Sequence, residues 1–244
     1  MLGAALDPRP LGPPGYFGKI VNLPDFVSRR LPRSFIEPWD DWLQQSVLSS
    51  KERLGADWHD IYMTSPIWRF VVSRGLCGPT AWAGVLMPSI DRVGRHFPFT
   101  LASELPDAVG HLAFMTKSIW FEELEQRALS TLDEPFDLET YDALLQRLVM
   151  PSPPVDLVSR LRNNQSTTAS WCFGLESAAA VSGSLPAITE SLLAGVLDRH
   201  SFWWTSGSDK VTPCLLVFGG LPPSAAYAAL LDGNWSRWGW MNWI

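Results

Sequence analysis

The residues with the clearest chemical potential lie close together in one stretch. Ser89, Asp91 and His96 fall within eight residues and offer a hydroxyl, a carboxylate and an imidazole, the three groups that nucleophilic acyl transfer uses. Members of such a triad normally come from distant parts of a chain, and the Gly-x-Ser-x-Gly pattern of a nucleophile elbow is absent from the sequence. The spacing therefore does not favour a hydrolase, and we expect no catalytic residue.

Metal and phosphate chemistry find less support still. The four histidines are separated by 37, 15 and 89 positions and form no His-x-x-x-His pair: His59, His96, His111 and His200. The three cysteines, at positions 77, 172 and 214, show no Cys-x-x-Cys spacing and fit buried thiols in a reducing compartment. The glycine pair at 219–220 lacks the lysine and hydroxyl of a phosphate loop. We expect no metal and no cofactor.

Asp91 also belongs to a short polar segment with Arg92 and Arg95, and apolar runs flank this segment on both sides. Charges of both signs at the neck of a hydrophobic hairpin are unfavourable unless they pair or face a partner. We expect the Asp91 carboxylate to accept hydrogen bonds from a nearby arginine, such as Arg92, Arg95 or Arg29, or from backbone N–H groups of the turn. The segment either locks a turn or presents a surface.

A second charged group lies near the N-terminus, where three arginines accompany two aspartates: Arg29, Arg30, Arg33, Asp25 and Asp40. Two interpretations stay open. In the first, the charges form a satisfied network that fixes the first loop against the helix that begins at Pro32. In the second, part of the cluster is open and pairs with an acidic protein surface. The planar fork of arginine suits either use.

The composition bounds the class of protein. The 244 residues, 46% hydrophobic and 18% charged, are typical of a globular protein with a substantial core. A net charge of −6 without a long basic run argues against a nucleic-acid partner. The first 14 residues contain four prolines and no apolar segment of signal length, and no run of about twenty apolar residues occurs. We therefore expect a cytoplasmic protein without a membrane span.

The elements that must position these residues follow from periodicity and turn signals. Strands are predicted at 16–20, 61–73 (interrupted at Pro66), 82–88, 97–103, 169–175, 200–205 and 211–218. The runs at 82–88 and 97–103 should pair as a hairpin around Asp91. Helices are predicted at 32–49, from Asp107 to 132, from Asp137 to 150, at 153–162, from Ser184 to 197 and at 222–231.

This mixture predicts an α/β fold with a central, largely antiparallel or mixed sheet and helices on both faces, a three-layer α-β-α sandwich in a single domain. We assign residues 1–14 to a proline-rich tail, 15–231 to the domain and 232–244 to a tryptophan-rich C-terminal segment.

The chain has an unusually high number of tryptophans, thirteen, and four of them fall within the last ten residues. Large aromatic side chains fill cores, but tryptophan also anchors interfaces. The C-terminal group either clamps onto the domain or forms an exposed aromatic hook. An exposed row of rings elsewhere would favour a carbohydrate- or peptide-binding module.

Several blocks of the sequence resemble, in the same order, the TagF (ImpM) family of accessory proteins of bacterial type VI secretion: Gly15–Ile20, Asp25–Pro32, Trp39–Leu43, Gly84–Leu101, Ser201–Ser208 (which holds Trp203 and Trp204) and Gly220–Pro222. The resemblance covers roughly residues 15 to 231. The chain departs from the family's first loop, Gly-Lys-Leu-Pro-x-x-Gly-Asp-Phe, with Val21 in place of the proline and Pro24 in place of the glycine. The resemblance therefore leaves the shape of this loop open.

The resemblance implies a function that the residues alone do not. TagF-like proteins are post-translational repressors of type VI secretion, their expected partner is the forkhead-associated scaffold protein of the apparatus, and no cofactor or enzymatic activity is implied. The residues alone support a binding module and leave two alternatives open, an aromatic-lined carbohydrate- or peptide-binding module and an enzyme without a recognisable motif.

Overall fold

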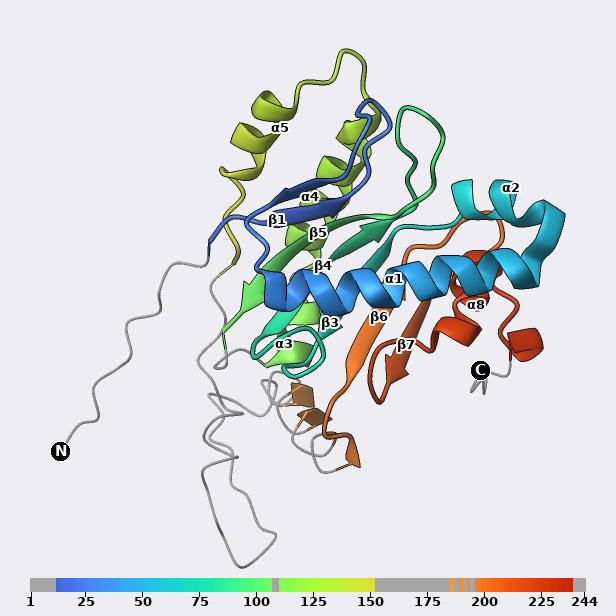
Figure 1. Cartoon of the computed structure of the whole chain (residues 1–244). Coiled ribbons are helices and arrows are strands. Elements are labelled where there is room, and N and C mark those ends of the chain that lie inside the picture. Colours follow the sequence, from blue (N-terminus) through green and yellow to red (C-terminus); the bar gives the residue numbers. More distant parts are fainter. Residues whose placement is uncertain are drawn as a thin grey trace, which may run out of the picture.

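A computed structural model describes residues 12–106, 110–151, 185–186, 189–190, 193 and 196–238. The chain forms a single α/β domain around a seven-stranded sheet with the strand order β2-β1-β5-β4-β3-β6-β7 (Figure 1), in which every neighbouring pair is antiparallel. The strands are β1 (Gly15–Gly18), β2 (Val27–Arg29), β3 (Trp68–Val72), β4 (Ala81–Met87), β5 (Phe99–Leu105), β6 (Ser201–Thr205) and β7 (Cys214–Phe218).

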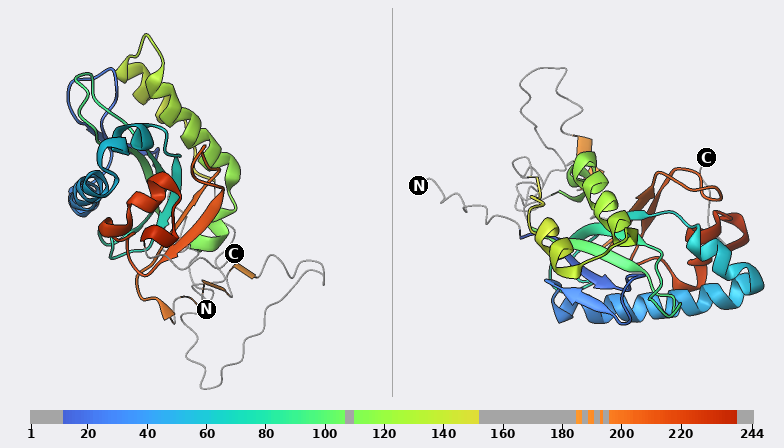
Figure 2. Two further views of the ribbon diagram at one scale, coloured as in Figure 1. Left: turned by 90° about the vertical axis from the view of Figure 1, so that its right-hand side faces the viewer. Right: turned by 90° about the horizontal axis from the view of Figure 1, so that it is seen from above.

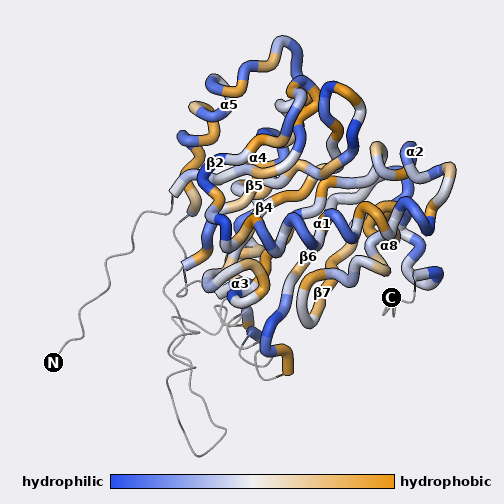
Figure 3. Tube along the Cα trace, viewed as in Figure 1, coloured by the Kyte–Doolittle hydropathy of each residue, from blue (hydrophilic) through white to orange (hydrophobic). Residues whose placement is uncertain are grey.

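The helices among the described residues are α1 (Arg33–Leu54), α2 (Trp58–Met63), α3 (His111–Met115), α4 (Ser118–Leu129), α5 (Leu138–Leu145) and α8 (Ala228–Asp232). Hydrophobic and hydrophilic residues alternate along α1 at helical spacing (Figure 3). Its buried stripe includes Phe35, Trp39 and Leu43, spaced by four residues, which is the pattern of an amphipathic helix.

The predicted hairpin around Asp91 is confirmed. Strands β4 and β5 pair over seven residues, from Ala81 opposite Leu105 to Met87 opposite Phe99. Both strands are almost entirely buried, which accounts for the continuous apolar sequence of β4; β5 also holds two buried hydroxyl residues and the exposed Glu104. The residues between them, 88–98, form the connection that carries the polar segment.

Two clusters of buried side chains make up the core. Neighbouring residues of a strand point to opposite faces of a sheet, and Phe70 and Val71 of β3 belong to different clusters. Helices α4 and α5 contribute to the cluster of Val71, whereas α1, α2 and α8 contribute to that of Phe70. Figure 2 shows α1 and α4 on different sides of the sheet. The complete three-layer order stays a prediction, because residues 152–184 lie outside the described part.

An ion pair fixes α4 to the sheet. The guanidinium of Arg69 in β3 donates from Nε and Nη2 to the two carboxylate oxygens of Glu125, at 2.7 and 2.8 Å. Bidentate pairing of this kind sets orientation as well as distance. The rotation of α4 about its axis is therefore defined, and with it the positions of Lys117 and Trp120 at the start of the helix.

Several predicted elements are corrected. The predicted strand at 61–73 is wrong in its first part, because α2 occupies Trp58–Met63 and β3 begins only at Trp68. Trp58 and Tyr62, four residues apart, are both buried on one side of α2, so helical spacing outweighs the β-forming character of the residues. The short strand β2, paired with β1, was not predicted.

The predicted helix boundaries also change. The helix expected from Asp107 to 132 is two helices, since Lys117 has a non-helical backbone that separates α3 from α4. Helix α1 continues to Leu54 and ends at Gly55, which has a positive φ of 60°. Helix α5 ends at Leu145 rather than 150, although Asp137 caps its start by accepting a hydrogen bond from the Thr140 N–H.

Near the C-terminus the predictions hold in outline. β7 begins at Cys214, later than expected, and the helix predicted at 222–231 is a 3-10 turn (Ser224–Ala226) followed by α8. The described residues between 185 and 196 are helical, as predicted for the helix from Ser184. The predictions for 153–162 and 169–175, and Asp107 itself, lie outside the described residues.

Candidate functional site

The Asp91 carboxylate is the centre of the connection between β4 and β5. It is 1% exposed and accepts four hydrogen bonds. Oδ1 accepts from the backbone N–H groups of Val93 (3.1 Å) and Arg95 (2.9 Å), and Oδ2 accepts from Lys19 Nζ (2.9 Å) and Arg95 Nε (2.7 Å). The expected bonds to an arginine and to backbone N–H groups are present. The ammonium of Lys19 is a partner that was not predicted.

The electrostatics of Asp91 follow from these contacts. Burial by itself would raise the pKa of the carboxyl group, but the hydrogen bonds from the Arg95 backbone, the Lys19 side chain and the Arg95 side chain outweigh burial and hold the pKa well below its usual range. Asp91 is therefore ionised at neutral pH, as a buried carboxylate with this set of donors should be.

The same hairpin is tied to the first loop, residues 19–26. The Arg92 N–H donates to the Leu23 carbonyl (3.0 Å), and Arg95 Nη2 donates to the Pro24 carbonyl (2.7 Å). Ser89 Oγ donates to the Lys19 carbonyl (2.8 Å). Residues 19–26 and 88–98 thus form one unit, which we call the two-loop surface. Pro24, where the chain departs from the family pattern, supplies one of the joining carbonyls.

Two glycines allow this geometry. Gly18 precedes the first loop with φ of 131°, and a Cβ atom there would lie 2.1 Å from the Pro98 carbonyl oxygen, so no other residue fits. Gly94 has φ of 83° in the turn, where its N–H donates to the Asp91 carbonyl at 2.9 Å. Both loops therefore have a backbone conformation that requires glycine at one position, Gly18 for the first loop and Gly94 for the hairpin.

The two-loop surface presents apolar and charged groups to solvent. Phe26 is 48% exposed and Val93 67% exposed, and the side chains of Arg92, Arg95 and Asp25 are exposed beside them. The Phe26 ring is held against Phe97 with ring centroids 4.8 Å apart. Aromatic side chains, phenylalanine among them, and arginine are enriched at protein interfaces.

This geometry does not assemble a hydrolytic triad. Ser89 Oγ bonds the Lys19 carbonyl, Asp91 is occupied by Lys19 and Arg95, and His96 Nε2 lies 2.8 Å from His59 Nδ1. Each of the three groups is therefore engaged elsewhere, and the described residues show no relay among them.

In a comparison with protein-family models, residues 15–148 match the TagF N-terminal domain, described as type VI secretion system-associated. The chain belongs to the TagF family. Among solved structures, it is similar to the crystal structure of PA0076 from Pseudomonas aeruginosa PAO1, with 37% sequence identity, a TM-score of 0.76, and coverage of 91% of this chain and 94% of that chain. No protein with a curated description matches.

In this TagF-family chain, the arginine cluster is built differently from the prediction. Arg29 pairs with Glu139 and, at 3.0 Å, with Asp142, and Arg30 Nη1 lies 2.6 Å from the other oxygen of Asp142. Their acidic partners thus come from α5. Arg29, at the end of β2, and Arg30, which follows it, therefore pair with α5 and not with the helix after Pro32.

The remaining members of the predicted cluster lie apart from it. Asp25 lies 3.8 Å from Arg95, in the two-loop surface, and Asp40 accepts a hydrogen bond from Gln44 on the same helix at 2.7 Å. Arg33 is exposed at the first residue of α1. Arg30 has a positive φ of 60°, which is uncommon for a residue other than glycine, and its Nε donates to the Pro14 carbonyl (2.9 Å).

Most of the tryptophans in the described part of the chain lie in the core of the TagF-family domain. Trp203 is fully buried and stacks on Trp39 with an interplanar angle of 6°, and its Nε1 donates to Ser201 Oγ at 3.0 Å. Trp204 packs on Phe121 with ring centroids 4.7 Å apart. Trp203 is thus a core position, and Trp204 packs against the core while staying partly exposed.

The described part of the C-terminal segment packs on the domain. Trp235 meets the Trp68 ring edge-on, with centroids 6.4 Å apart, and Trp238 Nε1 donates to the Asp232 carboxylate at 3.0 Å. The guanidinium of Arg53 in α1 lies 5.5 Å from the centroid of the Trp238 ring, so both tryptophans contact the domain, as a clamp requires. Trp240 and Trp243 lie outside the described residues.

Two histidine pairs escaped the sequence interpretation, because their members are 37 and 89 positions apart. His59 faces His96, and burial, followed by the nearby Lys51, lowers the pKa of His96. His111 Nδ1 lies 3.2 Å from His200 Nε2.

Within the described part of the chain, no group of three or more potential metal ligands occurs, and no helix is long and apolar enough to cross a membrane.

Proposed function

We propose that this TagF-family protein is a post-translational repressor of type VI secretion that binds the forkhead-associated scaffold protein of the apparatus in the cytoplasm and performs no catalysis. Membership of a type VI secretion-associated family supports the setting. The two-loop surface supports a role in binding, because it is fixed from within and exposes an aromatic ring, an aliphatic side chain and arginines.

The observation that carries this proposal is the buried ion pair that joins the two loops. Lys19 and Arg95 hold the two loops together through the buried carboxylate of Asp91, which both cations share. Rigid loops lose little conformational entropy when they bind, so a preformed surface binds more tightly than a mobile one. Repression then follows from sequestration, in which the domain covers a scaffold surface that assembly needs.

The arginines at 29–33 are the second candidate contact. Arg29 and Arg30 are already paired with acidic groups of α5, so a partner would have to compete with those ion pairs. Arg33 is exposed and free of this competition as judged from the described contacts. We therefore place the contact on the two-loop surface. Arg33 lies at the start of α1, beside the turn that precedes β4, at the other end of that strand from the hairpin, and is a separate candidate.

The proposal is tested by secretion. Deletion of the gene should raise effector secretion, overproduction of the protein should abolish it, and the amount of scaffold protein should be unchanged in both strains. A parallel strain that overproduces the double variant Arg92→Glu/Val93→Asp should secrete normally if the two-loop surface carries repression. Secretion that is unaffected by deletion and by overproduction would rule out the repressor function.

A further inference from the structure

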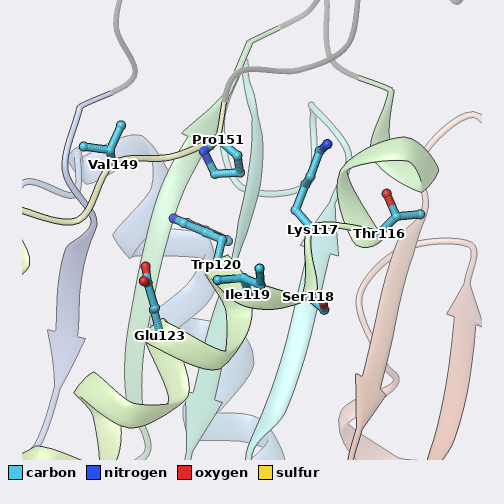
Figure 4. A pocket seen from close by; sticks show the side chains of 8 residues that line it. All are labelled: Thr116, Lys117, Ser118, Ile119, Trp120, Glu123, Val149 and Pro151. Carbon is cyan, nitrogen blue, oxygen red and sulfur yellow. The ribbon is translucent and has the colours of Figure 1, made fainter.

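An open pocket with a volume of about 400 Å³ lies at the start of α4 (Figure 4), away from the two-loop surface. Its lining combines the residues around the break between α3 and α4 with residues that follow α5: Thr116, Lys117, Ser118, Ile119, Trp120, Glu123, Val149 and Pro151. This volume is within the range of pockets that hold small ligands or a few residues of a peptide.

The indole N–H of Trp120 is the unusual feature of this pocket. Trp120 is 3% exposed, and no hydrogen-bond acceptor in the described structure reaches its Nε1. Phe114 and Phe121 pack edge-to-face with the ring, with centroids 5.2 and 4.9 Å away. A buried donor without a partner is unfavourable, and an acceptor supplied by a ligand would remove that cost.

The walls of the pocket are apolar and exposed. Ile119 is 71% exposed and Val149 79% exposed, although the two come from different elements. Pro151 adds a third apolar group. Exposed apolar side chains that converge on one hollow mark a site for an apolar ligand group.

The polar groups at the pocket define the rest of the ligand. Lys117 is the N-terminal flanking residue of the twelve-residue helix α4, whose first N–H groups receive no side-chain cap, and this end of a helix attracts an anion. Glu123 presents a carboxylate, which requires a donor. In Figure 4 the Lys117 ammonium and the Glu123 carboxylate lie on opposite sides of Trp120.

We propose that this pocket binds a short peptide segment of a partner protein, composed of an apolar side chain followed by a carboxylate. The apolar side chain packs on Ile119 and Val149, and a peptide carbonyl accepts from Trp120 Nε1. A peptide N–H donates to Glu123, and the carboxylate of an acidic residue or of a chain end pairs with Lys117. A sugar fits less well, because stacking needs the exposed face of an aromatic ring and Trp120 is buried.

The indole N–H resonances of the full-length ¹⁵N-labelled protein provide the test. Trp120→Phe removes one cross-peak and so identifies it, and Ile119→Ala, at an exposed position, identifies it independently by shifting it. N-acetyl-leucine, which offers all four groups, should move this cross-peak downfield and saturably, with a Kd on the order of 1 mM. N-acetyl-glycine should bind about tenfold more weakly, because it lacks the apolar side chain.

Matched variants separate the pocket from the rest of the molecule. Lys117→Gln should weaken binding of N-acetyl-leucine severalfold and reduce its preference over N-acetyl-leucinamide, which has no carboxylate, whereas Lys210→Gln should change neither. Val149→Asp should abolish binding, whereas Val93→Asp in the two-loop surface should not. A Trp120 cross-peak that stays in place with all three probes, or that moves equally in Val149→Asp, would overturn the proposal without affecting the proposed repressor function.

Discussion

Lys19 and Asp91 form a buried ion pair, 2.9 Å between Nζ and Oδ2, across 72 positions of sequence. Lys19 follows β1 and Asp91 follows β4, so this single contact joins the first loop to the hairpin. Because Arg95 shares the same carboxylate oxygen, two cations converge on one buried anion. The structure of the two-loop surface depends on this arrangement.

Asp91→Ala should strongly destabilise the protein. The substitution leaves the Lys19 ammonium buried without its partner and frees two backbone N–H groups, and losing one member of a buried pair costs about 3 kcal/mol or more. For a chain of this length, the melting temperature should fall by about 9 °C. Thermal unfolding followed by circular dichroism measures this, with the exposed Asp209→Ala as a control that should change little. An unchanged melting temperature in Asp91→Ala would contradict the role assigned to the pair.

The same carboxylate predicts a pH dependence. The pKa of Asp91 is lower in the folded protein than in the unfolded chain, so its contribution to the free energy of unfolding is fully present above the unfolded pKa of about 3.9 and is lost as the pH falls through the folded pKa. The stability difference between the protein and Asp91→Asn should therefore be constant between about pH 5 and 8 and shrink below pH 4. Urea unfolding at a series of pH values measures this stability difference. A difference that grows as the pH falls would contradict a lowered pKa for Asp91.

Asp142→Ala should destabilise less than Asp91→Ala. The Asp142 carboxylate is buried, but its partners Arg29 and Arg30 are partly exposed, so water can solvate the guanidinium groups after the change. A loss of about 1.5 kcal/mol is expected. Glu139→Ala, which removes the exposed partner of Arg29, serves as the control and should cost less again. If Glu139→Ala destabilised the protein as much as Asp142→Ala or more, burial of the carboxylate would not determine which substitution costs more.

Cys77 should be inert in the folded protein. It is fully buried, and burial raises the pKa of its thiol to about 12, so the reactive thiolate is scarce at pH 8. Iodoacetamide followed by mass spectrometry should modify Cys77 only after unfolding. Rapid modification of Cys77 under native conditions would indicate that the core around it opens.

Local patterns predicted much of the fold. The hairpin of β4 and β5, the buried face of α1 and the start of α5 after Asp137 each arise from residues close in sequence, where periodicity and turn chemistry act directly. β2 could not be predicted in this way. It has three residues and exists because Val27, Ser28 and Arg29 pair with β1.

The site was predicted only in part, for a related reason. The sequence pointed to Asp91, because a carboxylate between apolar runs needs partners. It could not identify Lys19, or Asp142 as the partner of Arg30, 112 positions away, since such pairings result from the packing of distant elements. The unpaired Trp120 was equally hidden, because a pattern of buried residues does not show which polar atoms stay without partners.

Binding of the scaffold protein to variants of the two-loop surface tests the central claim most directly. Arg92→Glu/Val93→Asp changes two exposed side chains of this surface, and Arg74→Glu/Leu48→Asp makes the matched changes at exposed positions elsewhere. Biolayer interferometry with the purified forkhead-associated scaffold should show at least about tenfold weaker binding for the first variant, since a few central residues dominate an interface. The control variant should bind like the unchanged protein. Equal affinity of both variants, each with an unchanged circular dichroism spectrum, would contradict the claim that the two-loop surface binds the scaffold.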